Sequence, residues 1–243
     1  MDYLKKKDTH GQTLSDKEVI MIIDCFDIET EPIISLKDFY GEQKHIVDTC
    51  LIIFSDEIHK HLLATYECEQ IAKLTCCNGD IPIYKMNYKG KDIAFYLTGI
   101  GSSLAACMCY ETNWLVGATK FIMFGSCGSL DREKTEGKFI LPTESYRGEG
   151  CSYYFAEPAD YIKIRNSNKL AAIFDKLGAP YVLGKVWTTD SMIRETKGLV
   201  AKRKDVSLLK WKWQVYRRCV ISTDWNYTIF WKQEMFWKQA DMK

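Results

Sequence analysis

Two short segments of small and polar residues have a composition that suits a small anionic ligand. The first, residues 98–101, reads Thr-Gly-Ile-Gly and follows an apolar run at 93–97. The second, residues 125–128, reads Gly-Ser-Cys-Gly and follows the apolar run at 121–124. Glycine-rich turns that follow strands of an open α/β sheet present main-chain N–H groups and helix starts, which attract anions. We therefore expect a small, polar or anionic ligand at this edge of the sheet.

The residues between the two segments predict the elements that position them. The run at 93–97 reads as a strand, and Ser102 or Ser103 can cap the helix that follows through the apolar residues 104–116. A second strand then leads into the second segment. The pattern predicts a βαβ unit in which both strands end in glycine-rich turns.

The composition limits the class of protein. A chain of 243 residues with 47% hydrophobic content can bury one sizeable core, and its net charge of +1 gives no electrostatic reason to bind nucleic acid or an anionic membrane. It contains no run with the length of a membrane span, and no signal peptide follows Met1. The ten cysteines lack zinc-ligand spacing. We expect a cytoplasmic α/β protein with reduced thiols, no metal, and neither a membrane nor a nucleic-acid partner.

The two glycine-containing segments, some two dozen residues apart, resemble the nucleoside phosphorylase and uridine phosphorylase superfamily, and the similarity covers roughly residues 48–204. The resemblance implies a three-layer α/β/α fold with a central mixed sheet. It implies glycosyl transfer in nucleoside metabolism and salvage: the N-glycosidic bond of a purine or pyrimidine nucleoside is cleaved with inorganic phosphate as co-substrate and no other cofactor. It also implies a homo-oligomer based on dimers, up to a hexamer.

The resemblance also assigns residues to a site. Gly125 and Ser126 match family positions that contact phosphate, and the run at 188–196 resembles the strand-end motif that precedes the base-recognition loop, with Met192 in the place of an aromatic residue. No catalytic residue is assigned. The residues that we predict for the ribose and base pocket are Cys127, Gly128, Arg147, Thr189, Asp190, Met192, Arg194 and Glu195.

The residues themselves leave two of these assignments open. Arg147 either supplies a cation to the site or pairs with Glu149 on the surface. Arg194 and Glu195 either contact the base edge or belong to a solvated helix start.

The chain departs from the family where arginines are expected to hold phosphate. Phe54-Ser55-Asp56 stands in place of a Gly-Asp-Pro-x-Arg loop, and Met123-Phe124 stands where an arginine often precedes the second segment. Bidentate arginine contacts hold phosphate strongly. Two alternatives to phosphorolysis therefore stay open, namely a nucleosidase that uses water and a nucleoside-binding or assembly subunit without turnover.

The composition changes abruptly after Val206. Five of the seven tryptophans follow residue 210, and the codons of 210–214, read one base earlier, can encode Glu-Met-Glu, which is the family's ribose-binding motif. We hypothesise that the reading frame was lost near Lys204 or Asp205, which would impair the activity of this chain. The predicted organisation is an N-terminal arm at 1–45, an incomplete phosphorylase-like domain at 46–205 and an altered tail at 206–243.

Overall fold

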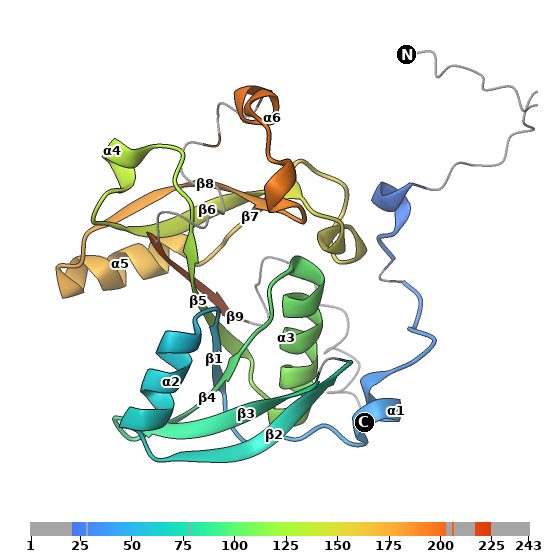
Figure 1. Ribbon diagram of the computed structural model, residues 1–243. Helices are drawn as coiled ribbons and strands as arrows, with labels where there is room; N and C mark the ends of the chain where they lie inside the picture. Colours follow the sequence, from blue (N-terminus) through green and yellow to red (C-terminus); the bar gives the residue numbers. More distant parts are fainter. Residues whose placement is uncertain (1–20, 28, 78, 203–205, 207–216, 225–243) are drawn as a thin grey trace, which may run out of the picture.

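The computed structural model describes residues 21–27, 29–77, 79–202, 206 and 217–224, with the main chain alone for Met192 and 217–224 (Figure 1). The helices are α1 Leu36–Tyr40, α2 Asp56–Thr65, α3 Ser102–Val116, α4 Arg132–Thr135, α5 Ser167–Leu177 and α6 Lys197–Lys202, with the short 3₁₀ helices η1 Ile22–Asp24, η2 Cys151–Tyr154 and η3 Met192–Arg194. The strands are β1 Thr49–Ile53, β2 Cys68–Cys76, β3 Gly79–Tyr88, β4 Lys91–Leu97, β5 Lys120–Cys127, β6 Phe139–Gly148, β7 Tyr161–Lys163, β8 Tyr181–Thr189 and β9 Arg217–Asp224. Among the helices of these ranges, none has the length and apolar character needed to cross a membrane.

The strands form one mixed sheet. In the part of the chain described, it has nine strands in the order β2-β3-β4-β1-β5-β9-β6-β7, and β8 pairs with β6. Strands β4, β1 and β5 run parallel, as do β6 and β8, whereas β2, β3 and β4 form an antiparallel meander. The predicted α/β class with a central mixed sheet is confirmed.

Helices cover both faces of the sheet, because side chains of a strand alternate between its faces. Cys50 and Ile52 of β1 belong to the core cluster that contains residues of α3, whereas Leu51 and Ile53 belong to the cluster that contains residues of α2. Figure 1 shows α2 and α3 on opposite sides of β1 and β4. Helix α5 packs its apolar side on Leu141 of β6. This arrangement confirms the predicted three layers.

The predicted serine cap of α3 is wrong. Neither serine at the start of α3 caps the helix with its side chain, because the residue at the N-cap position is Gly101 and no side chain accepts a hydrogen bond there. The hydroxyl of Ser102 instead donates to the carboxylate of Asp190 at 3.0 Å. The Ser102 hydroxyl, which the local pattern assigned to the helix cap, is therefore used in a contact between residues 88 positions apart.

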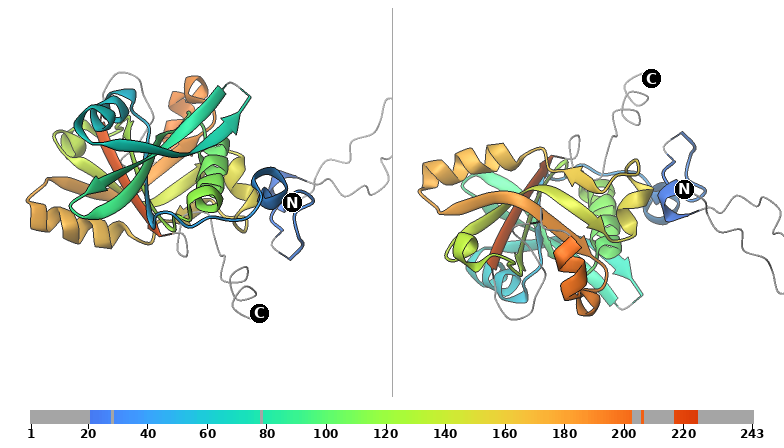
Figure 2. Two further views of the ribbon diagram at one scale, coloured as in Figure 1. Left: turned by 90° about the horizontal axis from the view of Figure 1, so that it is seen from below. Right: turned by 90° about the horizontal axis from the view of Figure 1, so that it is seen from above.

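The described part of the N-terminal arm runs beside α3, as Figures 1 and 2 show. The hydroxyl of Tyr40 donates to Glu111 at 2.8 Å, and the indole N–H of Trp114 donates to the carbonyl of Gly41 at 2.9 Å. At the end of α3, Gly117 has a φ of +78°, and a Cβ added there would lie 2.6 Å from the Cα of His45. The segment therefore packs directly on the helix that follows the first glycine-containing bend.

Of the stretch predicted to be an altered tail, the structure describes Val206 and the main chain of 217–224. That main chain forms β9, which lies between β5 and β6 in the sheet. The codon positions 210–214 lie outside the described residues, so the frame-shift hypothesis stays a prediction.

Candidate functional site

The carboxyl ends of β4, β1 and β5 lie side by side. The main-chain N–H of Thr98 donates to the carbonyl of Ile53 at 2.9 Å, and the N–H of Phe54 donates to the carbonyl of Phe124 at 3.1 Å. Neighbouring strands are about 4.8 Å apart, so the bends after β4 and β5 are about 10 Å apart, with β1 between them. The two glycine-containing segments therefore reach the same edge of the sheet.

The first bend places the start of α3 at this edge. Gly101 has a φ of +123°, which favours glycine, and it immediately precedes the helix. Leu104 lies so close to Gly99 that a side chain at position 99 would overlap it. Ile100, between the two glycines, is 77% exposed. The N-terminal end of α3, where N–H groups give a partial positive charge, is thus brought to the ends of the parallel strands.

The second segment differs from the prediction, because β5 continues through it as far as Cys127. The turn predicted at 125–128 is therefore wrong for its first three residues. The reason is an antiparallel partner from far along the chain, which extends the ladder. The main chain of β9 pairs with these residues in the register Gly125↔Cys219, Ser126↔Arg218 and Cys127↔Arg217.

The side chains of this segment differ in their access to solvent. Ser126 is exposed, whereas Cys127 and Gly128 are buried. A Cβ added to Gly125 would lie 3.1 Å from the Cβ of Phe54, so a glycine allows β1 and β5 to approach closely here. The hydroxyl of Ser126 is accordingly the side-chain group of the segment that a ligand can reach.

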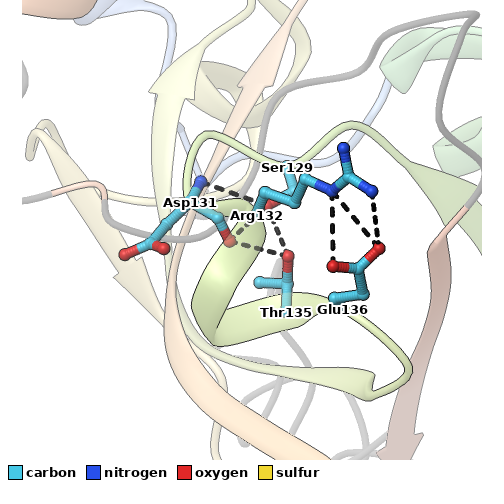
Figure 3. Close-up of polar contacts among 5 residues, drawn as sticks. All are labelled: Ser129, Asp131, Arg132, Thr135 and Glu136. Atoms are coloured by element: carbon cyan, nitrogen blue, oxygen red, sulfur yellow. Dashed lines mark hydrogen bonds and ion pairs between the residues drawn. The ribbon is translucent and has the colours of Figure 1, made fainter.

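A compact cluster holds the loop that follows β5 (Figure 3). The hydroxyls of Ser129 and Thr135 lie 2.6 Å apart, and the Thr135 hydroxyl donates to the carbonyl of Asp131 at 2.8 Å. The Asp131 carboxylate caps α4 by accepting the N–H of Lys134 at 3.2 Å. The ion pair between Arg132 and Glu136 in the same view is exposed and adds little. The cluster fixes the chain immediately after the second segment.

Asp190 joins the end of β8 to this edge. Its Oδ1 accepts the hydroxyl of Ser102 at 3.0 Å, and its Oδ2 accepts the main-chain N–H of Gly150 at 2.9 Å. The N–H of Asp190 itself donates to the carbonyl of Gly148 at 3.4 Å. The start of α3, the end of β8 and the loop after β6 therefore meet at one carboxylate. The structure brings Asp190 to the start of α3, and Thr189 precedes it as the last residue of β8.

Arg147 is buried, with 4% of its surface exposed. Its Nε donates to the hydroxyl of Ser152 at 2.8 Å, and its two terminal nitrogens donate to the carbonyls of Glu157 at 2.6 Å and Ala156 at 3.2 Å. The guanidinium also lies 3.9 Å from the ring centre of Tyr153. Burial lowers the pKa of Arg147, against the opposing charges of Tyr153 and Glu149. All these partners lie in the loop 148–157, so the arginine organises that loop from within.

The same loop contains a second buried charge. The carboxylate of Glu149, 7% exposed, accepts the main-chain N–H of Ser152 at 2.9 Å and also accepts its hydroxyl. The neighbouring Cys151 is close enough to the hydroxyl of Ser103 for a hydrogen bond, and burial raises the pKa of its thiol to about 11. Cys151 is therefore a neutral thiol near pH 7. The surface pair between Arg147 and Glu149 that the sequence allowed is replaced by two buried groups that share Ser152.

The remaining predicted pocket residues follow β8. The hydroxyl of Thr189 accepts the N–H of Ser191 at 3.3 Å, and η3 begins at Met192, whose side chain is not described. Arg194 is exposed and Glu195 is half-buried. Both residues follow β8 in the chain, and their contact with a base stays a prediction.

Sequence reasoning missed the partners that hold the site together. It considered Ser102 as a helix cap and gave no individual role to Ser152 or Gly150. Their signals were present but weak: a serine immediately after the second glycine of the first bend, and a Gly-Cys-Ser run shortly after Arg147. Pairing over 88 and 40 positions is not encoded in local spacing.

Comparison with known proteins gives consistent matches. The family profile described as "Phosphorylase superfamily" matches residues 51–214. A guanosine phosphorylase of Halorubrum lacusprofundi is 25% identical over 141 residues, which cover 57% of this chain and 58% of the relative. The match thus spans little more than half the length of that curated relative.

Solved structures show the same fold at low identity. The futalosine hydrolase of Helicobacter pylori has a TM-score of 0.55 and 15% identity, with 75% of this chain and 88% of that chain covered. The 5'-methylthioadenosine/S-adenosyl homocysteine nucleosidase of Campylobacter jejuni has a TM-score of 0.55 and 15% identity, with 79% and 91% covered. At this identity the structures support the fold alone.

Proposed function

Because the chain belongs to the phosphorylase superfamily, we propose that it cleaves the N-glycosidic bond of a purine or pyrimidine nucleoside with inorganic phosphate. The observation that supports this proposal is the meeting of four elements at one edge. The bends after β4 and β5 lie on either side of β1, and Asp190 at the end of β8 contacts the start of α3.

The proposed reaction is a transfer of the sugar from base to phosphate. A phosphate oxygen forms a bond to C1′ of the sugar, while the bond from C1′ to the base nitrogen breaks and its electron pair leaves with the base. The products are a sugar 1-phosphate and the free base, which takes up a proton. Positive charge develops on the sugar in the transition state, so the site accelerates the reaction by holding phosphate, sugar and base in line.

In this proposal the residues divide between the two substrates. Ser126, exposed at the end of β5, donates its hydroxyl to phosphate beside Gly125, and the N-terminal end of α3 adds partial positive charge. Thr189 and the residues after it form the side of the site that receives the nucleoside, with Arg194 and Glu195 as donors and acceptors for the base edge.

The end of β1 favours water as a second candidate for the attacking group. Asp56 and Glu57 occupy the first turn of α2, where the family resemblance places a phosphate-binding arginine. Asp56 pairs with Lys60 at 2.6 Å, so this cation is already used locally. Carboxylates near the site oppose the binding of an anion, whereas a neutral water molecule tolerates them. The second candidate function is therefore a nucleosidase.

One assay separates these functions. The purified full chain is incubated with a panel of purine and pyrimidine nucleosides, with and without inorganic phosphate, and the released base is measured by chromatography. Base release that requires phosphate and yields the sugar 1-phosphate supports the proposal. Base release without phosphate assigns a nucleosidase. Nucleoside binding without base release by either route assigns a binding subunit, and a version with the restored frame then shows whether the tail is the cause.

Ser126→Ala tests the proposed phosphate contact. We expect the KM for phosphate to rise about ten- to a hundredfold, since one hydrogen bond to a charged group contributes about 1.5–3 kcal/mol. Ser35→Ala is the matched control, because that serine bonds Asp38 within the N-terminal segment. An unchanged phosphate KM in Ser126→Ala contradicts the assignment.

A further inference from the structure

The carboxylate of Asp190 has the geometry of a fixed connection between two parts of the molecule. Each oxygen accepts one hydrogen bond, from Ser102 at 3.0 Å and from Gly150 at 2.9 Å. Ser102 belongs to the part built on β4, β1 and β5, whereas Gly150 follows β6 and Asp190 follows β8. The carboxylate therefore links the two parallel parts of the sheet at the edge where the candidate site lies.

Gly150 lies next to both Asp190 and the N-terminal segment. A Cβ added to Gly150 would lie 3.0 Å from Cδ1 of Ile22 and 3.8 Å from Oδ2 of Asp190. One residue further, the thiol of Cys151 is within hydrogen-bonding reach of Ser103. The first turn of α3 thus connects to the loop at two consecutive residues. Ser102 connects to Gly150 through Asp190, and Ser103 contacts Cys151 directly.

We infer that Asp190 is a positioning residue that holds the bend 98–101 and the loop 148–157 at a fixed separation, and so sets the shape of the nucleoside site. Each oxygen accepts a hydrogen bond from the protein, and in this role the carboxylate acts through the groups that it holds. This inference rests on the proposed function. It differs from the pocket role implied by family resemblance, because it assigns to Asp190 a task that an uncharged acceptor can perform.

Chemistry distinguishes the two roles. Asp190→Asn keeps one oxygen for the N–H of Gly150 and presents an NH₂ group to the Ser102 hydroxyl, which can accept as well as donate. Both connections are thus retained without the charge. Asp190→Ala loses both. A carboxylate that exchanged a proton with substrate or stabilised charge on it would fail in both variants.

The test compares nucleoside kinetics and binding in the full-length chain. We expect Asp190→Ala to raise the nucleoside KM and the dissociation constant at least about tenfold, because displacement of positioning groups by about 1 Å is enough for large losses. We expect Asp190→Asn to stay within about threefold of wild type, and Ser102→Ala, which removes one connection, to lie between them. The control is Asp175→Ala on α5, which loses an equivalent bond from the hydroxyl of Tyr181 at the start of β8.

Each outcome decides the inference. Asp190→Asn as impaired as Asp190→Ala overturns it, and so does Asp190→Ala with wild-type kinetics and binding. If Asp190→Ala does not fold, Ser102→Ala carries the test, and unchanged nucleoside binding in that variant overturns the inference. A wild-type chain that neither binds nor cleaves nucleosides overturns the proposed function together with this inference, whereas normal wild-type activity with insensitive variants overturns this inference alone.

Discussion

Replacing Arg147, near the end of β6, by methionine is expected to destabilise the fold strongly. The guanidinium is 4% exposed and makes hydrogen bonds to one hydroxyl and two carbonyls of the loop 148–157. Methionine has a similar stem and retains the packing of the methylene groups. The variant therefore isolates the loss of the charged head.

The magnitude follows from two contacts. The bond to Ser152, a residue 1% exposed, lies beyond the reach of water, and a hydrogen bond to a charged group contributes about 1.5–3 kcal/mol. The contact with the Tyr153 ring, 3.9 Å from the guanidinium carbon, adds about 2 kcal/mol when desolvated. We leave out the carbonyl of Glu157, because that residue is exposed and water can replace the donor. The expected loss in the free energy of unfolding is about 3–5 kcal/mol.

Urea unfolding followed by tryptophan fluorescence measures this loss. With a slope of about 2–3 kcal/mol per molar urea, the midpoint should fall by about 1–2 M. Arg147→Lys keeps the charge and loses the planar fork, so its midpoint should lie between wild type and Arg147→Met. Arg132→Met removes an exposed arginine that pairs with Glu136 and should leave the midpoint unchanged. The reasoning is refuted if Arg147→Met unfolds within about 0.3 M of wild type, or if Arg132→Met loses as much.

Two further perturbations have expected outcomes. Gly117→Ala should lower the free energy of unfolding by about 2–4 kcal/mol, because Gly117 combines a left-handed φ with close contact to His45. Gly178→Ala should lower it by about 1 kcal/mol, because Gly178 has a φ of +61° but open space around it. Equal losses in urea unfolding would contradict this. Burial against Phe95 lowers the pKa of His59, so the unfolded chain binds a proton at this histidine more strongly than the folded chain does. The stability that His59 contributes above the unfolded-state pKa of about 6.5 is therefore lost as the pH falls below that value. Thermal melts from pH 7.5 to 5 should show a smaller loss of stability in His59→Phe, by about the contribution of one histidine.

The elements that carry the site were readable from the sequence where their signal is local. The strand at 49–53 is a continuous apolar run, the alternation at 81–88 gives the β3–β4 hairpin, and α5 ends at a glycine with positive φ. These features depend on neighbours within a few positions. The glycine-containing bend at 98–101 belongs to the same class, because a bend beside a strand end needs a small residue at a defined place.

The end of β5 shows how a distant strand changes a local prediction. Gly125 and Ser126 have turn-like composition, yet β9 extends the ladder to Cys127. Ladder hydrogen bonds come from the main chain, so a segment such as 219–223, Cys-Val-Ile-Ser-Thr, whose composition favours a strand, can pair between β5 and β6. The presence of a strand here is therefore compatible with either reading frame. Sequencing the locus tests the hypothesis directly, since an in-frame gene without Glu-Met-Glu codons in the neighbouring frame would end it.

Ser102 and Asp190 were both selected from the sequence, but the contact between them was not predicted. Resemblance selected Asp190 from the Thr-Thr-Asp run, and local pattern selected Ser102 as a helix cap, but neither source relates two residues 88 positions apart. The structure joins them, and with them the two parallel parts of the sheet. A serine that caps a helix is replaceable by any cap residue, whereas a serine that donates to Asp190 must reach a fixed oxygen. Ser102→Asp therefore separates the two roles. An aspartate would satisfy the cap role that the local pattern assigned to Ser102, but it places a second carboxylate against Asp190, so we expect weaker nucleoside binding because the connection is lost.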